Sequence, residues 1–372
     1  MHKPPQTTGS MRKALLIALL LLAALPAFGL PGPCPLPCAA AQERPSRDGK
    51  QDGWATLQRA LPAHPRTLFV GAHPDDETAV AGLLTWLAAR GRLWMVSLTA
   101  GENLDTRARA PQPSSGRPRG GYHAPWGDPP ARRGSALGRR RAAVFRMVAK
   151  VLGAERAIIG PFVNGPLPLA ELDARAGTAP YRDWVNEPPE RVLAKWGRDV
   201  GSDAGAPARH LARLIRSLRP HLVVSFDGWC GGSGHPEHLA AALALRQAVA
   251  LAADPMKTPA RASGRSIPAW KTPLWITSAF IAPALAACGY CKCRGEPPEG
   301  AVLTLALDTA GREGSSPLSP RVGKCLALIH YAVASRRGGI AAAQEPRLQR
   351  LCHGRALAQT PEEEQVRLIR LE

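Results

Sequence analysis

Two short polar segments of the sequence contain the residue types that can bind a catalytic zinc ion. Residues 73–77 read His-Pro-Asp-Asp-Glu, and residues 235–238 read His-Pro-Glu-His. Imidazole nitrogens and carboxylate oxygens are common zinc ligands, and a catalytic zinc ion takes three of them and keeps one position for water. We expect the three ligands to be His73, Asp76 and His238. The predicted chemistry is hydrolysis by an activated water molecule.

Asp75 and His235 would lie beside this metal without binding it. Hydrolysis needs a base for the proton of the water and an acid for the leaving group, and these two side chains could supply both. Each segment alone has a simpler explanation, because acidic residues in the first turn of a helix complement the helix dipole. The occurrence of both segments at equivalent strand ends favours the metal site.

The residues around the first segment predict a β-α-β unit. Residues 67–72 and 93–98 are short apolar runs of strand type, and apolar residues recur at helical spacing between Asp76 and Arg90. This unit implies neighbouring parallel strands with a right-handed crossover. Further strands are predicted at 157–160, 221–226, 274–280 and 302–307, and further helices at 138–152, 190–194, 209–218 and 236–252.

The alternation of strands and helices predicts an α/β protein, with a three-layer, Rossmann-like domain and a mainly parallel sheet. Ligands of such sheets bind beyond the carboxyl ends of the strands, which is where both polar segments fall. The first strand is followed by neither a G-x-G-x-x-G motif nor a Walker A loop. Nucleotide binding therefore has no support.

The predicted catalytic domain spans residues 65–336. A signal peptide is expected over residues 1–41, and residues 42–64 form either a linker or an N-terminal helix. Residues 103–137 are rich in Gly, Pro and Arg and predict a long loop or lid, because such insertions in compact domains are usually functional or disordered. Residues 337–372 are expected to form a C-terminal extension.

The N-terminus is typical of an export signal. Arg12 and Lys13 precede an apolar run from Ala14 to Leu25, and the small residues 39–41 offer a cleavage site. The apolar run is shorter than the roughly 20 residues that a membrane-spanning helix needs. We therefore predict a periplasmic, secreted or envelope-associated protein, with membrane contact only if this segment stays uncleaved.

The cysteines are consistent with an oxidising compartment. Cleavage after residue 41 would leave six of the 8 cysteines, namely Cys230, Cys288, Cys291, Cys293, Cys325 and Cys352. An even number in an exported protein favours disulfides, whose pairing the sequence does not reveal. The cluster of three between residues 288 and 293 could instead bind a metal, although no second C-x-x-C pair accompanies it.

The formal net charge of +19 raises the question of a polyanionic partner. The excess arginine is scattered along the chain, does not alternate with aromatic residues and accompanies no zinc-finger spacing. Nucleic acid is therefore not an expected partner. The charge predicts either a solvated basic surface or attraction to a polyanionic polymer of the cell envelope.

Three motifs of the chain resemble those of the PIG-L/LmbE-like N-acetylglucosaminyl de-N-acetylases. They are Ala-His-Pro-Asp-Asp-Glu at 72–77, Leu-Thr-Ala-Gly-Glu at 98–102 and His-Pro-Glu-His at 235–238. The resemblance runs from about Thr67 to His330. Near its end, Asp308 and the K-x-x-A-x-x-H spacing of Lys324, Ala327 and His330 look like the family's acidic strand end and following helix.

The resemblance implies removal of an acetyl group from an N-acetylated amino sugar. It makes His73, Asp76 and His238 the ligands of a Zn2+ ion, although another divalent metal would fit the same set. It also makes Asp75 the general base, and His235 the residue that stabilises the oxyanion and protonates the departing amine.

Two positions depart from the family pattern. Val144 stands where a glutamate is frequent, and Glu237 replaces the more frequent aspartate between the two histidines. These departures leave the predicted metal ligands intact and put the substrate contacts in doubt.

Glu102, Arg107 and Trp126 are candidate substrate contacts. A lid over residues 103–137 could stack Trp126 on a sugar ring and use arginines such as Arg107 to hold a phosphate or uronate, so the glycan could be anionic. Glu102, like Glu77, could instead have a structural role behind the metal ligands. Two other functions compete with deacetylation, namely glycan binding through a vestigial metal site and zinc-dependent hydrolysis of another amide or of an ester.

Overall fold

The computed structural model describes residues 53–103, 134–174, 187–229, 235–257, 267–278, 299–307, 318–337, 352 and 363–371. The predicted signal peptide, residues 104–133 of the predicted lid and the cysteine cluster between 288 and 293 lie outside these ranges. Within them, no helix is long and apolar enough to cross a membrane.

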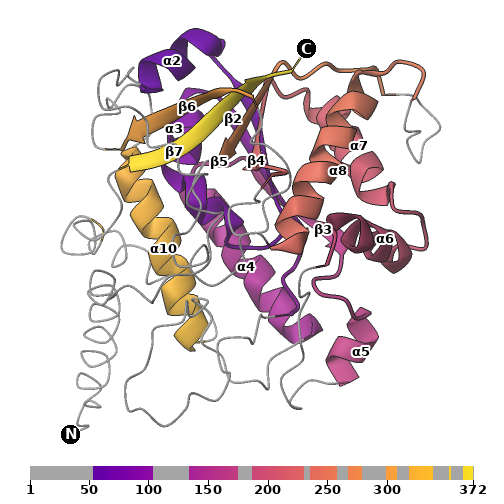
Figure 1. Cartoon of the computed structure of the whole chain (residues 1–372). Coiled ribbons are helices and arrows are strands. Elements are labelled where there is room, and N and C mark those ends of the chain that lie inside the picture. The colour runs from indigo at the N-terminus through magenta and orange to yellow at the C-terminus, as the bar shows by residue number, and fades with distance from the viewer. Residues whose placement is uncertain are drawn as a thin grey trace, which may run out of the picture.

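A single sheet of seven strands forms the centre of the described fold, in the order β3-β2-β1-β4-β5-β7-β6 (Figure 1). Strands β1 to β5 run parallel to one another, and β7 is antiparallel to both β5 and β6. The strands are β1 (Arg66–Gly71), β2 (Arg92–Thr99), β3 (Arg156–Phe162), β4 (Leu222–Phe226), β5 (Leu274–Ser278), β6 (Ala301–Ala306) and β7 (Glu363–Arg370). The mainly parallel sheet confirms the predicted α/β class.

Helices cover both faces of this sheet. The elements are α2 (Gly53–Ala60), η3 (Asp76–Val80), α3 (Ala81–Arg90), α4 (Ser135–Val151), α5 (Leu169–Ala174), α6 (Pro189–Asp199), α7 (Ala206–Leu218), α8 (Pro236–Ala253) and α10 (Pro320–Arg337). Figure 1 shows α3, α4 and α10 on one side of the sheet and α6, α7 and α8 on the other. The result is a three-layer α/β/α arrangement.

The alternation of side chains along β1 explains why both faces need a helical layer. Phe69 belongs to the hydrophobic core on the side of α3, α4 and α10. Leu68 and Val70 belong to the second core, on the side of α6, α7 and α8. Successive residues of a strand point to opposite faces, so a strand that is apolar on both must be covered on both.

The C-terminal region is part of this sheet. The prediction treated residues 337–372 as an extension, but β7 lies between β5 and β6 and pairs with both. Val366 of β7 is fully buried in the first core. The segment that contains β7 is therefore not separate from the domain, because its backbone completes the sheet.

The segment between residues 42 and 64 also contains regular structure. Helix α2 lies within it, and its Trp54 donates a hydrogen bond from Nε1 to the carbonyl oxygen of Ala306 at 2.8 Å. Of the two alternatives for this segment, residues 53–60 form the helix.

One disulfide lies within the described residues. Cys325 of α10 is bonded to Cys352, with 5.8 Å between their Cα atoms. Both cysteines are buried in a small cluster with Val322, Leu326 and Ile329. The disulfide therefore joins α10 to the chain segment that leads to β7.

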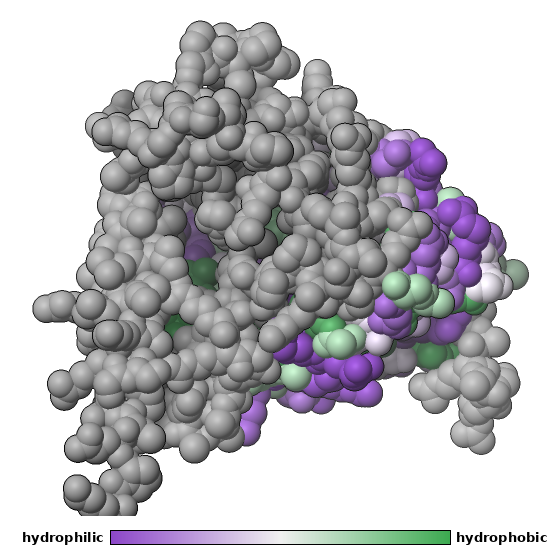
Figure 2. Space-filling model, turned by 90° about the horizontal axis from the view of Figure 1, so that it is seen from below, coloured by the Kyte–Doolittle hydropathy of each residue, from purple (hydrophilic) through white to green (hydrophobic). Residues whose placement is uncertain are grey.

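The described surface is largely polar. Figure 2, which views the molecule from below, shows mainly hydrophilic residues with small hydrophobic spots among the coloured atoms. Among the described residues, the exposed large hydrophobic side chains are Val200 and Met256.

Candidate metal centre

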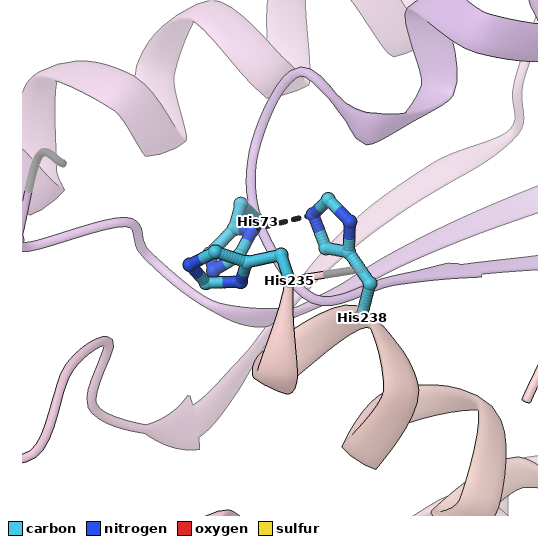
Figure 3. Close-up of side chains that lie close together, drawn as sticks. All are labelled: His73, His235 and His238. Carbon is cyan, nitrogen blue, oxygen red and sulfur yellow. Dashed lines mark hydrogen bonds between the residues drawn. The ribbon is translucent and has the colours of Figure 1, made fainter. Parts of the chain in front are cut away.

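The two polar segments meet where the strand order of the sheet reverses. Strand β1 pairs with β2 on one side and with β4 on the other. His73 follows the end of β1, while His235 and His238 stand at the start of α8, the helix that comes after β4. Figure 3 shows the three imidazole rings converging from these two elements. Ligands of α/β sheets bind at such a switch point.

Three donor atoms form a triangle that suits one metal ion. The Nδ1 atom of His73 lies 3.1 Å from Nε2 of His238, and Oδ1 of Asp76 lies 3.1 Å from the same Nε2. The third side of the triangle, from Nδ1 of His73 to Oδ1 of Asp76, measures 3.6 Å. Ligands about 2.0–2.2 Å from a tetrahedral zinc ion lie about 3.3–3.6 Å from one another, so the triangle has the required size.

His235 offers an alternative third ligand. Nitrogen atoms of His73, His235 and His238 lie within 4.8 Å of one another, and this group could also hold a metal. Two ligands of one zinc ion can be at most about 4 Å apart, given bonds of about 2 Å. The shorter distances favour the set with Asp76, and they leave His235 as a neighbour of the metal.

The backbone around the β1 turn fixes the orientation of Asp76. Its Oδ2 atom accepts hydrogen bonds from the backbone N–H groups of Ala72 at 2.6 Å and His73 at 3.0 Å, so Oδ1 faces the histidines. Burial opposes ionisation of this carboxyl, but the nearby His238 and His73 hold its pKa well below the usual range. Asp76 is therefore ionised and could bind a metal as an anionic ligand.

Gly71 makes room for this arrangement. A Cβ atom at this position would lie 2.8 Å from Cβ and 3.0 Å from Oδ2 of Asp76. Such contacts are too short for a side chain, so the close approach of Asp76 to β1 requires glycine here.

Glu237 holds the other side of the His73 ring. Its Oε2 atom forms a very short hydrogen bond with Nε2 of His73. A ring nitrogen that donates its proton to a carboxylate leaves the opposite nitrogen free to bind a metal, and it also fixes the ring plane. The position that departs from the family pattern therefore supports the candidate ligand His73 directly.

Glu237 is held in turn by the loop after β3. Its carboxylate accepts hydrogen bonds from Nδ2 of Asn164 and from the backbone N–H of Gly165, the latter at 2.7 Å. The side chain is fully buried. Burial opposes its ionisation, but the hydrogen bond with His73 outweighs this effect and lowers the pKa of Glu237 to about 2. Asn164 was not predicted as part of the site, because its only sequence signal is that of an isolated polar residue after a strand.

The carboxylates also determine the protonation of His73 when no metal is bound. Burial of the ring disfavours the imidazolium, but hydrogen bonds with Asp76 and Glu237 overcome this penalty and raise the pKa of His73 to about 10. A metal ion must therefore displace a proton from this ring.

Asp75, the predicted base, lies next to the ligands in an unusual backbone conformation. Its φ is 111° and its ψ is −16°, in a region that residues other than glycine rarely adopt. Its side chain is 23% exposed, and Oδ2 lies 3.1 Å from Nη2 of Arg141. The carboxylate can therefore reach a bound molecule while Arg141 holds its Oδ2 atom.

Arg141 of α4 links this base to two neighbouring loops. Its buried guanidinium also donates hydrogen bonds to the carbonyl oxygens of Pro74 at 2.8 Å and Gly101 at 3.1 Å. Arg141 was not among the predicted site residues. The available signal was its position on the apolar face of a helix between Leu137 and Val144, where an unpaired charge would be costly.

The second histidine of the triangle is also fixed by packing. The ring of Phe226, at the end of β4, stacks on His238 with 4.5 Å between ring centres and an angle of 19°. The ring of His235 lies 5.1 Å from each of the other two histidine rings, measured between centres. All five residues predicted for metal binding and proton transfer thus lie in one cluster.

Of the three candidate substrate contacts, the structure describes one. Glu102 is buried, and its Oε2 accepts a hydrogen bond from the backbone N–H of Asn164 at 3.1 Å, which favours the structural role over substrate contact. Burial raises the pKa of this carboxyl. Arg107 and Trp126 lie outside the described residues.

Comparison with known proteins agrees with this site. The family model described as PIG-L, GlcNAc-PI de-N-acetylase, matches residues 68–249. A deacetylase of 1D-myo-inositol 2-acetamido-2-deoxy-alpha-D-glucopyranoside from Segniliparus rotundus is 33% identical over 193 residues, which cover 51% of this chain and 51% of that protein. The chain thus spans about half the length of the curated relatives it matches.

Two solved structures are weakly similar to this one. The zinc-inhibited form of a teicoplanin deacetylase has a TM-score of 0.45 and 17% identity, covering 82% of this chain and 99% of that one. The N,N'-diacetylchitobiose deacetylase from Pyrococcus horikoshii has a TM-score of 0.37 and 14% identity, covering 99% and 95%. Both similarities are too loose to decide the reaction. The sequence match shows a PIG-L family domain over residues 68–249, and this range includes every residue of the candidate metal centre.

Proposed function

We propose that this protein is a zinc-dependent deacetylase that hydrolyses the acetamide group of an N-acetylglucosamine-type sugar. The observation that carries the proposal is the triangle of His73, Asp76 and His238, with sides of 3.1, 3.1 and 3.6 Å, at the switch point of the sheet. Two imidazoles and one carboxylate form a donor set typical of catalytic zinc sites. A zinc ion held there would polarise the acetamide carbonyl and bring the pKa of a water molecule to about 7.

The remaining side chains supply the proton transfers. Asp75 accepts a proton from the attacking water, and Arg141 keeps its carboxylate in place from 3.1 Å. His235, which adjoins the two histidine ligands, donates a proton to the leaving nitrogen as the C–N bond breaks. The products are acetate and a free amine.

The substrate class is supported by the relatives. The Segniliparus protein is named for an N-acetylated glucosaminyl-inositol, and the matching family model is named for an N-acetylglucosaminyl lipid. A 2-acetamido sugar is the feature that these names share. The residues that would distinguish the aglycone include Arg107 and Trp126 of the predicted lid.

Metal analysis and an acetate-release screen test the proposal. The purified protein should contain about one zinc ion per chain, consistent with a single ligand triangle. It should release acetate from at least one of three groups of compounds: N-acetylglucosaminyl-inositols, chitooligosaccharides and peptidoglycan fragments. Zinc binding without acetate release from any of them would favour a vestigial glycan-binding site. Faster hydrolysis of simple esters or other amides would favour a different acyl substrate.

Two variants test the division of roles between the neighbouring aspartates. Asp75→Ala should abolish turnover and retain zinc, because Asp75 lies outside the ligand triangle. Asp76→Ala should lose zinc, because it removes one of the three ligands. Full activity in either variant would refute the assignment.

Export is a second part of the proposal. It rests on the basic and apolar pattern of residues 12–25 and is supported by the Cys325–Cys352 disulfide, because disulfides are rare in reducing compartments. Fractionation of cells that express the full chain should place the protein outside the cytoplasm. Mass spectrometry of its N-terminus should show whether cleavage occurs after residue 41.

A further inference from the structure

We infer that Tyr331 of α10 is a positioning residue for the catalytic base, acting on Asp75 through the buried carboxylate of Glu77. The inference rests on the proposed function, since it assumes that Asp75 is the base. Tyr331 lies beyond residues 68–249, the part of the chain that the family model matches. The reaction would then depend on a helix from outside that segment.

A direct chain of hydrogen bonds joins the three residues. The hydroxyl of Tyr331 donates a very short hydrogen bond to Oε1 of Glu77. The other carboxylate oxygen, Oε2, accepts the backbone N–H of Asp75 at 3.1 Å. Tyr331 therefore fixes the position of the group that holds the backbone of Asp75.

The backbone of Asp75 needs such support. Its φ of 111° is unfavourable for a residue with a Cβ atom, and such conformations persist only where surrounding contacts impose them. Thr78 supports the carbonyl side of Asp75. Its N–H and its hydroxyl donate to the backbone carbonyl oxygen of Asp75 at 3.0 and 2.6 Å. On the amide side, the Glu77 carboxylate is the hydrogen-bond acceptor.

Both members of the chain are suited to a fixed role. Glu77 is fully buried and Tyr331 is 1% exposed, so water does not replace a lost hydrogen bond readily. Burial, together with the nearby Glu77, raises the pKa of Tyr331 well above its usual value. The phenol therefore keeps its proton and remains a donor.

Helix α10 contacts the metal-binding turn at a second place, which provides a comparison. Lys324 lies seven residues before Tyr331 in the same helix, and its Nζ donates to Oε1 of Glu364 at 2.7 Å and to the carbonyl oxygen of Ala79 at 3.1 Å. Glu364 accepts two backbone N–H groups in the first turn of α3, from Gly82 and Leu83, at 2.9 Å each. This contact stabilises the junction of η3 and α3 but does not touch Asp75. Its loss should lower stability without a specific effect on the base.

Tyr331→Phe is the central test, because it removes one hydroxyl and keeps the packing of the ring. The turnover number kcat should fall roughly 10- to 100-fold, as is typical when a group that orients a reacting residue is lost. KM and the zinc content should stay at wild-type values, since the substitution leaves the ligand triangle in place. Unchanged kcat, or a fall that follows a loss of zinc, would overturn the inference.

Thr272→Val is the matched control. This residue is also fully buried, and its hydroxyl has no hydrogen-bond partner among the described residues. It precedes β5 and thus lies at the opposite end of the sheet from the metal centre. The Thr272→Val variant should have the kcat of the wild type. An equal fall in both variants would show that Tyr331 acts only through general stability.

A second variant keeps the inference testable if Tyr331→Phe does not fold. Glu77→Gln preserves shape but cannot accept both hydrogen bonds with its two terminal atoms. It should lower kcat by a similar factor, and the double variant should lose little more than either single variant, because the two residues act in one chain. Independent, multiplying effects would contradict the proposed chain.

A crystal structure of the Tyr331→Phe protein separates this inference from the proposed function. If the wild-type protein releases no acetate from any N-acetylated sugar, the proposed function fails. The positioning role can then still be tested through the backbone conformation of Asp75, which needs no activity measurement. A shift of φ out of the left-handed region supports the role, and an unchanged φ overturns it.

Discussion

Glu237 and His73 form a hydrogen-bonded pair in which the carboxylate occupies the side of the ring opposite the metal triangle. The two residues come from the helix after β4 and the turn after β1, so the pair also joins the two polar segments. Its consequence is a fixed imidazole whose Nδ1 faces His238.

Glu237→Gln should weaken zinc binding. The amide can still meet Nε2 of His73, but it no longer supplies the negative charge that increases the basicity of the ring. Loss of such a carboxylate partner typically lowers metal affinity about 10- to 100-fold. Competition with a chromogenic chelator would measure the change. Glu155→Gln is a suitable control, because Glu155 is an exposed carboxylate that pairs with Arg92 far from the metal centre. Equal affinities in Glu237→Gln and wild type would refute the supporting role.

Zinc binding should release a proton from His73 and should strengthen with pH. The pKa of this ring is raised from 6.5 to about 10 by its two carboxylate partners. The imidazolium therefore stabilises the metal-free fold fully below pH 6.5, and this contribution is lost as the pH rises through about 10. Within that window, zinc competes with the proton, so the affinity should rise up to about tenfold per pH unit.

Calorimetry in buffers of different ionisation enthalpy would detect this proton. Near pH 7, the measured heat should vary with the buffer in proportion to about one proton released per zinc ion. The ionised Asp76 should add none, since its pKa is already well below the usual range. Heats that do not depend on the buffer would contradict the protonation state assigned to His73.

Much of the layout was predictable because it follows from local patterns. The apolar runs at 67–72 and 93–98 correspond to β1 and β2, and the helical spacing after Asp76 corresponds to η3 and α3. Strand β7 was missed because its sequence mixes charged and apolar residues. Its place between β5 and β6 depends on pairing with strands more than 50 residues earlier in the chain.

The metal triangle was predictable for a related reason, whereas its supports were not. His73, Asp76 and His238 stand at strand ends, where the topology of a parallel sheet brings polar groups together. Asn164, Arg141 and Tyr331 approach from a loop and two helices that are distant in sequence. Their local sequence signals are weak, because their roles depend on how α4, α10 and the loop after β3 pack around the turn.

The Cys325–Cys352 disulfide should make stability sensitive to reduction. It closes a loop across a sequence separation of 27 residues and joins α10 to the segment before β7. Replacement of both cysteines by alanine should lower the free energy of unfolding by about 2–5 kcal/mol, the usual effect of losing a native disulfide. Thermal unfolding followed by circular dichroism would show the loss as a lower Tm. A variant as stable as the oxidised wild type would show that the bond contributes nothing.

Gly71→Ala should damage the metal centre from the side of the sheet. The added Cβ would lie 2.8 Å from Cβ of Asp76 and 3.0 Å from its Oδ2, the atom that anchors this ligand to the backbone. Relief of the clash must move Asp76, because β1 is held between β2 and β4 in the centre of the sheet. Zinc affinity should therefore fall. The free energy of unfolding should also fall, by about 1–3 kcal/mol.

Gly228→Ala separates this effect from the general cost of replacing a glycine. Gly228 follows β4 and is near the same edge of the sheet. Among the described residues, a Cβ atom there would meet only Cβ of Ala242, at 3.9 Å. This variant should keep the wild-type zinc affinity in the same chelator competition. If both variants bind zinc as the wild type does, the contact between Gly71 and Asp76 does not limit the position of the ligand. If only Gly71→Ala loses zinc, strand β1 itself sets the distance at which Asp76 meets the two histidines.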